Sequence, residues 1–375
     1  MYERLIKKHI ESWMFKGKTL IIYGARQVGK TTLAEEIIAP YGTQARYIDC
    51  DLASNAQALS VQEPNLLKEF IGNYKVVVID EAQRVKNIGV NLKILHKYFP
   101  ETQIIATGSS SFDLANEVNE PMTGRAVEFL LQPLSVEEIS KQYDPLAMQS
   151  RVESIMRFGT YPAVFDKPEE VASSELITIS QNYLYKDILS FEKIKKSAIV
   201  FKLLQLLALQ VGQEVSLNEI GQKLQISHLT VEKYLDILEK TFVVFTLRAF
   251  KRNLRDEIGK PFKVYFWDLG IRNSLINNFN QMDLRNDVGA LWENFCISEK
   301  LKSNGNNRQL VNSYFWRTND QKEIDLVQES GGNLSTYEFK WNEKKTAKLP
   351  TKFAEAYPNT TFKVVNRDNF LSELF

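Results

Sequence analysis

The sequence predicts an α/β protein whose N-terminal third holds a parallel sheet covered by helices on both faces. Between Lys18 and Pro133, short runs rich in β-branched residues alternate with helical patterns; the runs are TLIIYG, ARYIDC, KVVVID, TQIIATG and AVEFLLQ. Runs that are apolar throughout, rather than at alternate positions, are typical of strands buried on both faces of a parallel sheet. Beyond this region the pattern becomes mostly helical before strands return.

Length and composition indicate a globular protein of more than one domain. The 375 residues exceed what one hydrophobic core usually organises, so we expect two or three domains. The formal net charge is only +1, so contact with a polyanion must come from local basic patches. Two cysteines and three histidines argue against both a disulfide framework and a Cys/His zinc site.

We also expect a cytoplasmic protein with no membrane segment. The N-terminus MYERLIKKHIESW mixes charged and apolar residues, whereas a signal peptide needs an unbroken apolar core. The longest apolar run, LLQLLALQV, is about half a membrane span and is interrupted by Gln205 and Gln210.

The first apolar run leads into a loop that is suited to phosphate. GARQVGKT matches the pattern G-x-x-x-x-G-K-[ST], and it lies between a predicted strand and a predicted helix, which makes a chance match in a glycine turn the weaker alternative. The glycines let successive N–H groups and the helix N-terminus point at phosphate oxygens. Lys30 is expected to reach the β- and γ-phosphates of ATP, and Thr31 to bind the accompanying Mg²⁺. The predicted cofactor-binding residues are Gly24, Ala25, Arg26, Gln27, Val28, Gly29, Lys30, Thr31, Thr32 and Asp80.

The third and fourth apolar runs supply polar residues at their ends. VVVIDEAQR ends in Asp80, predicted to hold the magnesium shell, and in Glu81, predicted to orient or deprotonate the attacking water. This pair favours a hydrolase over a kinase, although acidic residues are also common at the start of a helical turn. QIIATGSSS ends in Thr107, with Ser109 close behind. Thr107 can sense the γ-phosphate or the water, and a simple Gly-Ser turn explains the pattern equally well.

Five segments in one order resemble the AAA+ class ATPases of bacteria and archaea: YGARQVGKTT, VVVIDEAQR, ATGSSS, MTGRAVEFLLQPLS and FGTYPAVF. The resemblance covers nearly the whole chain and implies an ATP hydrolase with a P-loop parallel sheet that works as a homo-oligomer. It implies for Arg125 a role as a finger acting on a neighbour's nucleotide or as a phosphate sensor, with a surface salt bridge as the alternative. The loop has Ala25 where these ATPases often have proline, which should matter little because the loop binds phosphate through its backbone.

The middle of the chain resembles a winged helix. SLNEIGQKLQISHLTVEKYLDILEKT contains a helix, a short turn at QIS and a second helix that begins at His228. That helix is poor in basic residues. The following wing segment, RAFKRNLRDEIGKPFK, is richer and suits phosphate contact without base readout, although a winged helix can also serve only as a packing module. Its basic residues are Arg248, Lys251, Arg252, Arg255, Lys260 and Lys263.

The last part of the chain, from Val288 to Asn366, resembles the PD-(D/E)xK nucleases. Asp325 lies in KEIDLVQ, Glu338 and Lys340 lie in TYEFKW, and Glu293 lies in the preceding predicted helix. The resemblance implies that the three carboxylates hold a divalent metal while Lys340 positions the water. Because EID replaces the usual proline-aspartate, we expect binding more than cleavage. Nearby residues would form a basic rim or an ordinary solvated surface; they are Arg317, Lys322, Lys344, Lys345 and Lys348.

The sequence thus predicts three domains with a helical lid or linker, and two competing functions. In chain order the segments are an AAA+ core (1–134), a helical lid or linker (135–194), a winged helix (195–280) and a small α/β nuclease-like domain (281–375). The first function is a Mg-dependent ATPase that couples ATP hydrolysis to the binding or remodelling of nucleic acid, DNA more than RNA. The alternative is a regulatory ATPase switch that controls protein contacts, with the last domain as a docking surface.

Overall fold

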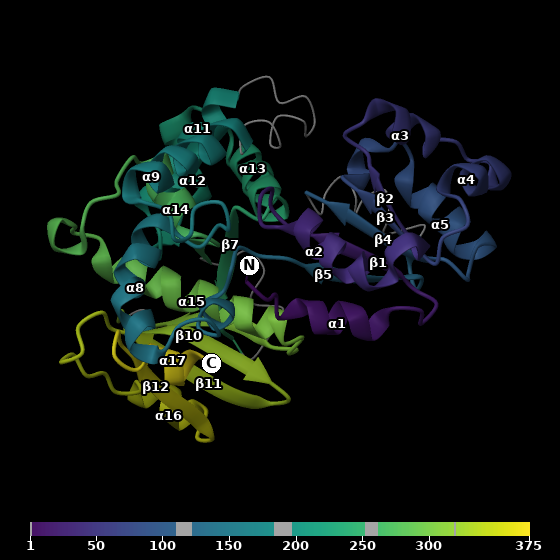
Figure 1. Cartoon of the computed structure of the whole chain (residues 1–375). Coiled ribbons are helices and arrows are strands. Elements are labelled where there is room, and N and C mark those ends of the chain that lie inside the picture. Colours follow the sequence, from purple (N-terminus) through teal and green to yellow (C-terminus); the bar gives the residue numbers. More distant parts are fainter. Residues whose placement is uncertain (1, 110–121, 184–196, 252–261, 319) are drawn as a thin grey trace. The chain divides into compact units, whose positions relative to one another are not determined.

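The computed structural model describes residues 2–109, 122–183, 197–251, 262–318 and 320–375 (Figure 1). The chain forms two compact units. The first comprises Met1–Pro133 with Lys240–Phe242, and the second comprises Leu134–Glu239 with Val243–Phe375. Among the described residues, no helix combines the length and the apolar character needed to cross a bilayer.

The first unit is built on a five-stranded parallel sheet in the order β2-β3-β4-β1-β5. All five strands predicted from the apolar runs are present, and the predicted fold class is confirmed. The three central strands, β1, β3 and β4, are buried along their whole length, which is why their sequences are apolar without alternation. The strands are β1 (Thr19–Tyr23), β2 (Ala45–Asp49), β3 (Val76–Asp80), β4 (Gln103–Gly108) and β5 (Ala126–Leu130).

Helices cover both faces of this sheet. On one face, alternate strand residues such as Ile21, Val77 and Ile104 share a hydrophobic cluster with Leu67 of α4 and Leu92 of α5. The residues between them point to the other face and are also buried, and α2 contacts β3 and β4 outside that cluster. The helical segments are α1 (Ile6–Trp13), α2 (Lys30–Ile38), η1 (Ala39–Gln44), α3 (Ala53–Ala58), α4 (Pro64–Ile71), η2 (Ala82–Arg84) and α5 (Ile88–Tyr98).

The second unit opens with helices, as its sequence predicts. Its early helices are α7 (Val136–Ile139), which begins with a capping box at Ser135, α8 (Pro145–Phe158) and α9 (Glu169–Thr178). The later helical segments are η3 (Ile179–Tyr183), α11 (Ser197–Leu209), α12 (Leu217–Leu224), α13 (His228–Lys240), α14 (Leu269–Leu275), η6 (Met282–Leu284), α15 (Val288–Asn306), α16 (Thr351–Ala356) and α17 (Phe370–Leu374).

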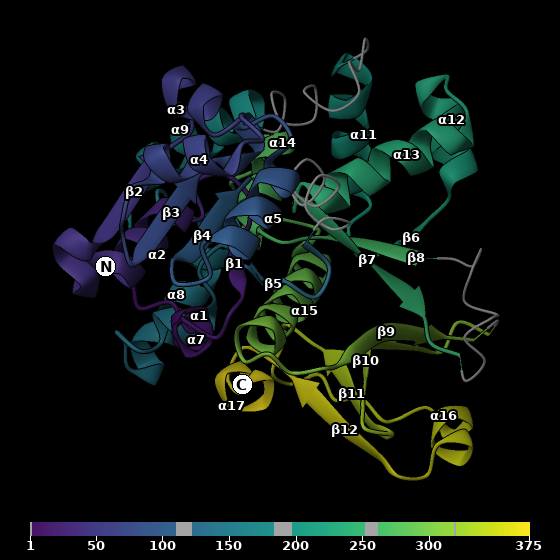
Figure 2. The ribbon, with the colours of Figure 1, turned by 90° about the vertical axis from the view of Figure 1, so that its right-hand side faces the viewer.

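A single seven-stranded sheet runs through the second unit in the order β12-β11-β10-β9-β7-β8-β6 (Figure 2). The antiparallel pair β7 and β8 joins the C-terminal strands because β7 pairs in parallel with β9, Ala249 opposite Phe315. The boundary expected near residue 280 therefore does not separate two sheets. The strands are β6 (Glu214–Val215), β7 (Val244–Ala249), β8 (Phe262–Phe266), β9 (Asn312–Arg317), β10 (Glu323–Ser330), β11 (Asn333–Phe339) and β12 (Thr360–Val365). Neither β6 nor β12 was predicted from the sequence.

Candidate active site

The predicted phosphate loop, residues 24–31, lies at the carboxyl edge of the first sheet. β1 ends at Tyr23, the loop follows, and α2 begins at Lys30. β3 ends at Asp80, and Thr107 lies near the end of the adjacent β4. Because parallel strands end at the same edge of a sheet, these segments meet there.

Two glycines of the phosphate loop are needed for its shape. At Gly24, an added Cβ would lie 2.2 Å from the carbonyl oxygen of Leu131, which no side chain could tolerate without a shift of the backbone. Gly29 has a φ of +94° at the start of α2, a left-handed conformation that favours glycine. The loop pattern therefore follows from close backbone approach at one glycine and from backbone conformation at the other.

Arg4, which the sequence analysis did not single out, ties the phosphate loop to the segment after β5. Its side chain is buried, and its guanidinium donates to the carbonyl oxygens of Val28, at 2.8 Å, and Gln132, at 2.6 Å. Both acceptors are backbone atoms, so neither partner leaves a signal in the sequence.

Lys30 lies inside the phosphate loop. It is buried, and its ammonium donates to the carbonyl oxygens of Gly24 and Ala25, each at 2.9 Å. The cation is thus held within the loop by two neutral acceptors, which an anion with its greater charge could replace.

Asp80 accepts hydrogen bonds from three hydroxyl groups. Thr31 donates to Oδ2 at 2.8 Å, Thr107 donates to Oδ1, and Tyr47 of β2 also donates to Oδ2. Burial and the bond to Asp80 raise the pKa of Tyr47 well above its ordinary value, so its hydroxyl keeps its proton and remains a donor. The adjacent oxygens of Thr31 and Asp80 are of the kind that Mg²⁺ prefers, and they fit a magnesium ion that arrives with a nucleotide.

Glu81 is held beside the end of β4. Its backbone is left-handed, with φ at +50°, and its N–H donates to the hydroxyl of Thr107 at 3.2 Å. The amide of Gln83 donates both to the Glu81 carboxylate and to the hydroxyl of Ser109, the latter at 3.0 Å. Gln83 lies within the segment VVVIDEAQR, yet the sequence analysis gave it no role.

The predicted residues of the phosphate loop therefore meet Asp80, Glu81 and Thr107 at one edge of the sheet, whereas Arg125 does not. Arg125 precedes β5, and its carbonyl oxygen accepts a hydrogen bond at 2.9 Å from the N–H of Thr19, the first residue of β1. This is the amino edge of the sheet, opposite the loop. The interpretation of Arg125 as a sensor of its own subunit's phosphate is therefore wrong, because the length of β1 separates the two; a role at a neighbour's nucleotide stays a prediction.

Comparison with known families agrees with this geometry. Residues 16–140 match a family model described as an AAA domain. Together with the parallel sheet and the phosphate loop, this match places the N-terminal unit in the AAA+ class of P-loop ATPases. Residues 149–282 and 288–372 match two models described as domains of unknown function, DUF8612 and DUF4143.

Two relatives that match most of this chain are described as uncharacterized proteins. Rv2008c of Mycobacterium tuberculosis is 25% identical over 331 residues, which cover 87% of this chain and 71% of the relative. MJ1637 of Methanocaldococcus jannaschii is 25% identical over 340 residues, which cover 79% of this chain and 68% of the relative. Among solved structures, the RuvB Holliday junction branch migration motor of Thermotoga maritima is 15% identical with a TM-score of 0.30, covering 64% of this chain and 86% of that one. A TM-score this low carries no argument about partners.

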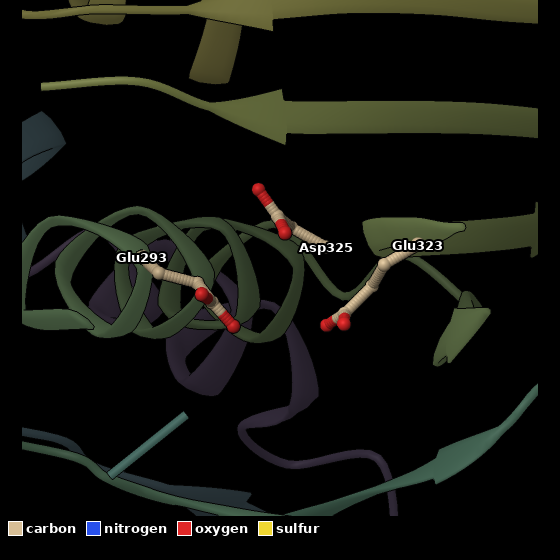
Figure 3. Close-up of side chains that lie close together, drawn as sticks. All are labelled: Glu293, Glu323 and Asp325. Carbon is tan, nitrogen blue, oxygen red and sulfur yellow. The ribbon is translucent and has the colours of Figure 1, made fainter. Parts of the chain in front are cut away.

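A second group of acidic side chains lies between α15 and β10 of the second unit. Carboxylate oxygens of Glu293, Glu323 and Asp325, the acidic cluster, lie within 4.8 Å of one another (Figure 3). Glu323 was not predicted as a member. Its signal is its position two residues before Asp325, since alternate residues of a strand point to the same face. Glu338, the predicted third ligand, is not among these three; it lies beside Asp325 on the neighbouring β11, and its carboxylate accepts a hydrogen bond from Lys340 at 2.6 Å.

Asp325 is deeply buried within the acidic cluster. Its Oδ2 accepts a hydrogen bond at 2.8 Å from the N–H of Phe339. Burial, followed by the charges of Glu293 and Glu338, raises the pKa of Asp325 well above its ordinary value.

Lys263 of β8 reaches into the acidic cluster. It is only 2% exposed, and its ammonium donates to Glu293 at 3.0 Å and pairs with Glu323. Burial by itself would lower the pKa of Lys263, but the two carboxylates raise it above its ordinary value, so the side chain stays charged. The prediction that Lys263 is available to phosphate is wrong, because its side chain points into the unit.

The other basic residues predicted to contact phosphate form two groups: those that are exposed and those that lie outside the described residues. Arg248 and Lys251 are exposed, and all five residues of the basic rim are exposed as well, with Arg317 paired to Glu214 at 3.2 Å. Arg252, Arg255 and Lys260 lie outside the described residues. Helix α13 is the second helix of the predicted winged helix. It borders a groove of about 760 Å³ whose lining includes four carboxylates, from Glu214, Glu232, Asp236 and Glu239.

Proposed function

We propose that this protein is a Mg-dependent ATPase. The observation that carries the proposal is the Asp80 carboxylate, which accepts hydrogen bonds from Thr31, Thr107 and Tyr47 beside the phosphate loop and is followed directly by Glu81. In P-loop ATPases these positions serve the metal, the phosphate and the attacking water.

Each group has a task in this reaction. The N–H groups of the phosphate loop and the Lys30 ammonium would bind the β- and γ-phosphates, and Thr31 with Asp80 would hold the magnesium that accompanies ATP. That ion neutralises charge on the transferring phosphate. Glu81 would accept a proton from the attacking water or orient it.

Two variants test the assignment. Lys30→Ala removes the cation that faces the phosphates and should weaken ATP binding, whereas Glu81→Gln should keep ATP affinity and lower the turnover rate by about a hundredfold or more. Lys93→Ala and Glu69→Gln change exposed residues of the same unit and serve as controls. Fluorescent-nucleotide titration and phosphate release measure the two quantities. Unchanged turnover in both site variants would refute the proposal.

Coupling of ATP turnover to nucleic acid is a second candidate function. The exposed basic rim favours it, since several cations on one unit can replace the counterions of a phosphate backbone. The carboxylates beside α13 would repel phosphate, so that helix is poorly suited to read bases. We therefore propose contact with the backbone that is independent of sequence.

The test is ATP turnover and gel-shift binding with duplex DNA, single-stranded DNA and RNA at several salt concentrations. Binding should weaken as salt rises, and the triple variant Lys344→Ala, Lys345→Ala, Lys348→Ala should flatten that dependence. Lys93→Ala again serves as the control. Absence of both binding and stimulation at low salt would favour the alternative, a nucleotide switch that controls protein contacts.

A further inference from the structure

The acidic cluster is joined across the sheet by a lysine from a distant strand. In the order β10-β9-β7-β8, two strands separate Lys263 from Glu323, so their backbones are roughly 14 Å apart at the usual strand spacing. The lysine side chain extends over the sheet, and its ammonium lies 5.4 Å from the ring centre of Phe315 on the intervening β9. The ammonium ends between Glu293 and Glu323, with which it forms ion pairs.

Two of the carboxylate oxygens in the cluster also accept hydrogen bonds from other donors. Tyr265, two residues after Lys263 on the same face of β8, donates to the same oxygen of Glu293 at 2.6 Å. Asp325 accepts from the N–H of Phe339. A divalent metal needs several oxygen ligands directed at one open point, whereas Glu293 and Glu323 are directed at an ammonium.

The residues present therefore do not fit a resident metal ion, although the resemblance to nucleases implies one. We propose that the Lys263 ammonium takes the place of a divalent metal in the acidic cluster. The cluster fastens β8 to α15 and β10, and it does not support metal-dependent cleavage. A buried ion pair of this kind holds its elements together. Removal of one partner would destabilise the fold, because the other partners would remain charged and desolvated. This inference does not depend on ATP hydrolysis.

Mn²⁺ binding to the full chain tests the proposal, with free Mn²⁺ measured by its electron paramagnetic resonance signal in the absence of nucleotide. Wild type and Asp325→Asn should bind the same number of ions, because the wild-type cluster holds none. Lys263→Ala should bind one more ion than wild type, and the double variant Lys263→Ala, Asp325→Asn should lose it. Lys322→Ala removes an exposed lysine of the same unit and should match wild type.

Two results would overturn the proposal. One is loss of a bound Mn²⁺ when Asp325→Asn is introduced into the wild type, or DNA cleavage by the wild type that this change abolishes. The other is a folded Lys263→Ala chain that gains no ion, since Lys263 would then not be what excludes the metal. If Lys263→Ala does not fold, the comparison of wild type with Asp325→Asn and Glu323→Gln still decides whether the native cluster holds a metal.

Discussion

Gln83 forms a hydrogen bond with the carboxylate of Glu81, the proposed catalytic residue. Its amide donates to Glu81 and to Ser109, so it fixes Glu81 relative to the end of β4. A carboxylate that orients water must be placed closely, because small errors in position lower the rate steeply. The amide also adds no charge beside Glu81, the proposed base.

We expect Gln83→Ala to lower the ATP turnover rate on the order of tenfold while ATP affinity stays unchanged, because only the orientation of Glu81 is lost. Gln83→Glu should lower turnover further, since a second carboxylate would face Glu81. Single-turnover kinetics and nucleotide titration measure the two effects, with Gln57→Ala on the exposed face of α3 as the control. A faster rate in Gln83→Ala would show instead that the bond restrains Glu81 in an inactive position.

At the scale of elements, Asp287 joins α14 to the start of α15. Its carboxylate accepts from Arg272 at 2.7 Å and from the Nε of Arg285 at 2.8 Å, and both guanidiniums are buried. Burial would raise the pKa of Asp287, but the two guanidiniums hold it below its usual range. The ion pairs thus fix the entry of the helix that carries Glu293.

We expect Asp287→Asn to destabilise the second unit by about 3 kcal/mol, because two buried guanidiniums lose their counter-charge. Asp283→Asn, at an exposed position nearby, should change stability little. Urea unfolding followed by tryptophan fluorescence suits this measurement, since four of the five tryptophans lie in the second unit: Trp267, Trp292, Trp316 and Trp341.

The effect of Asp287→Asn on the free energy of unfolding should depend on pH. A folded pKa below the unfolded value means that Asp287 stabilises the fold above the unfolded pKa of about 3.9, and that this contribution disappears as pH falls through the folded pKa. The stability difference between wild type and Asp287→Asn should therefore be largest near neutral pH and shrink below about pH 4. A difference that is constant across this range would indicate that packing, and not charge, accounts for the loss.

At the scale of the whole molecule, the position of Arg125 is the reason to predict a homo-oligomer. It lies at the amino edge of the first sheet, roughly 16 Å along β1 from the phosphate loop, so it can act on phosphate only in another subunit. We predict that Arg125→Ala lowers the turnover rate much more than ATP affinity, as loss of a transition-state contact does.

Mixing the two defective variants tests the assembly directly. Arg125→Ala and Lys30→Ala should restore part of the activity when combined, because each supplies what some of the other's sites lack. The mass of the wild type should rise when an ATP analogue is added, as light scattering can show. A monomeric mass together with no gain on mixing would leave Arg125 with a purely structural role.

The sequence by itself determined the first sheet and most of the candidate nucleotide site. Strand burial on both faces requires unbroken apolar runs, and a loop that binds phosphate through its backbone requires glycines at fixed spacing, so both leave local patterns. Asp80, Glu81 and Thr107 were found because each lies at or directly beyond the end of an apolar run, and parallel strands end at one edge.

Only the tertiary structure decided which partners these residues have. Arg4 bonds to backbone carbonyls, which carry no side-chain identity, and Tyr47 reaches Asp80 from a neighbouring strand. Lys263 meets Glu323 across two intervening strands because β7 pairs with β9, a pairing between segments far apart in the chain. Periodicity fixes the face on which a side chain lies, but strand order and register fix what it meets there. The fold brings Glu323 together with Glu293 and Asp325, and the register of β10 with β11 places Glu338 beside Asp325.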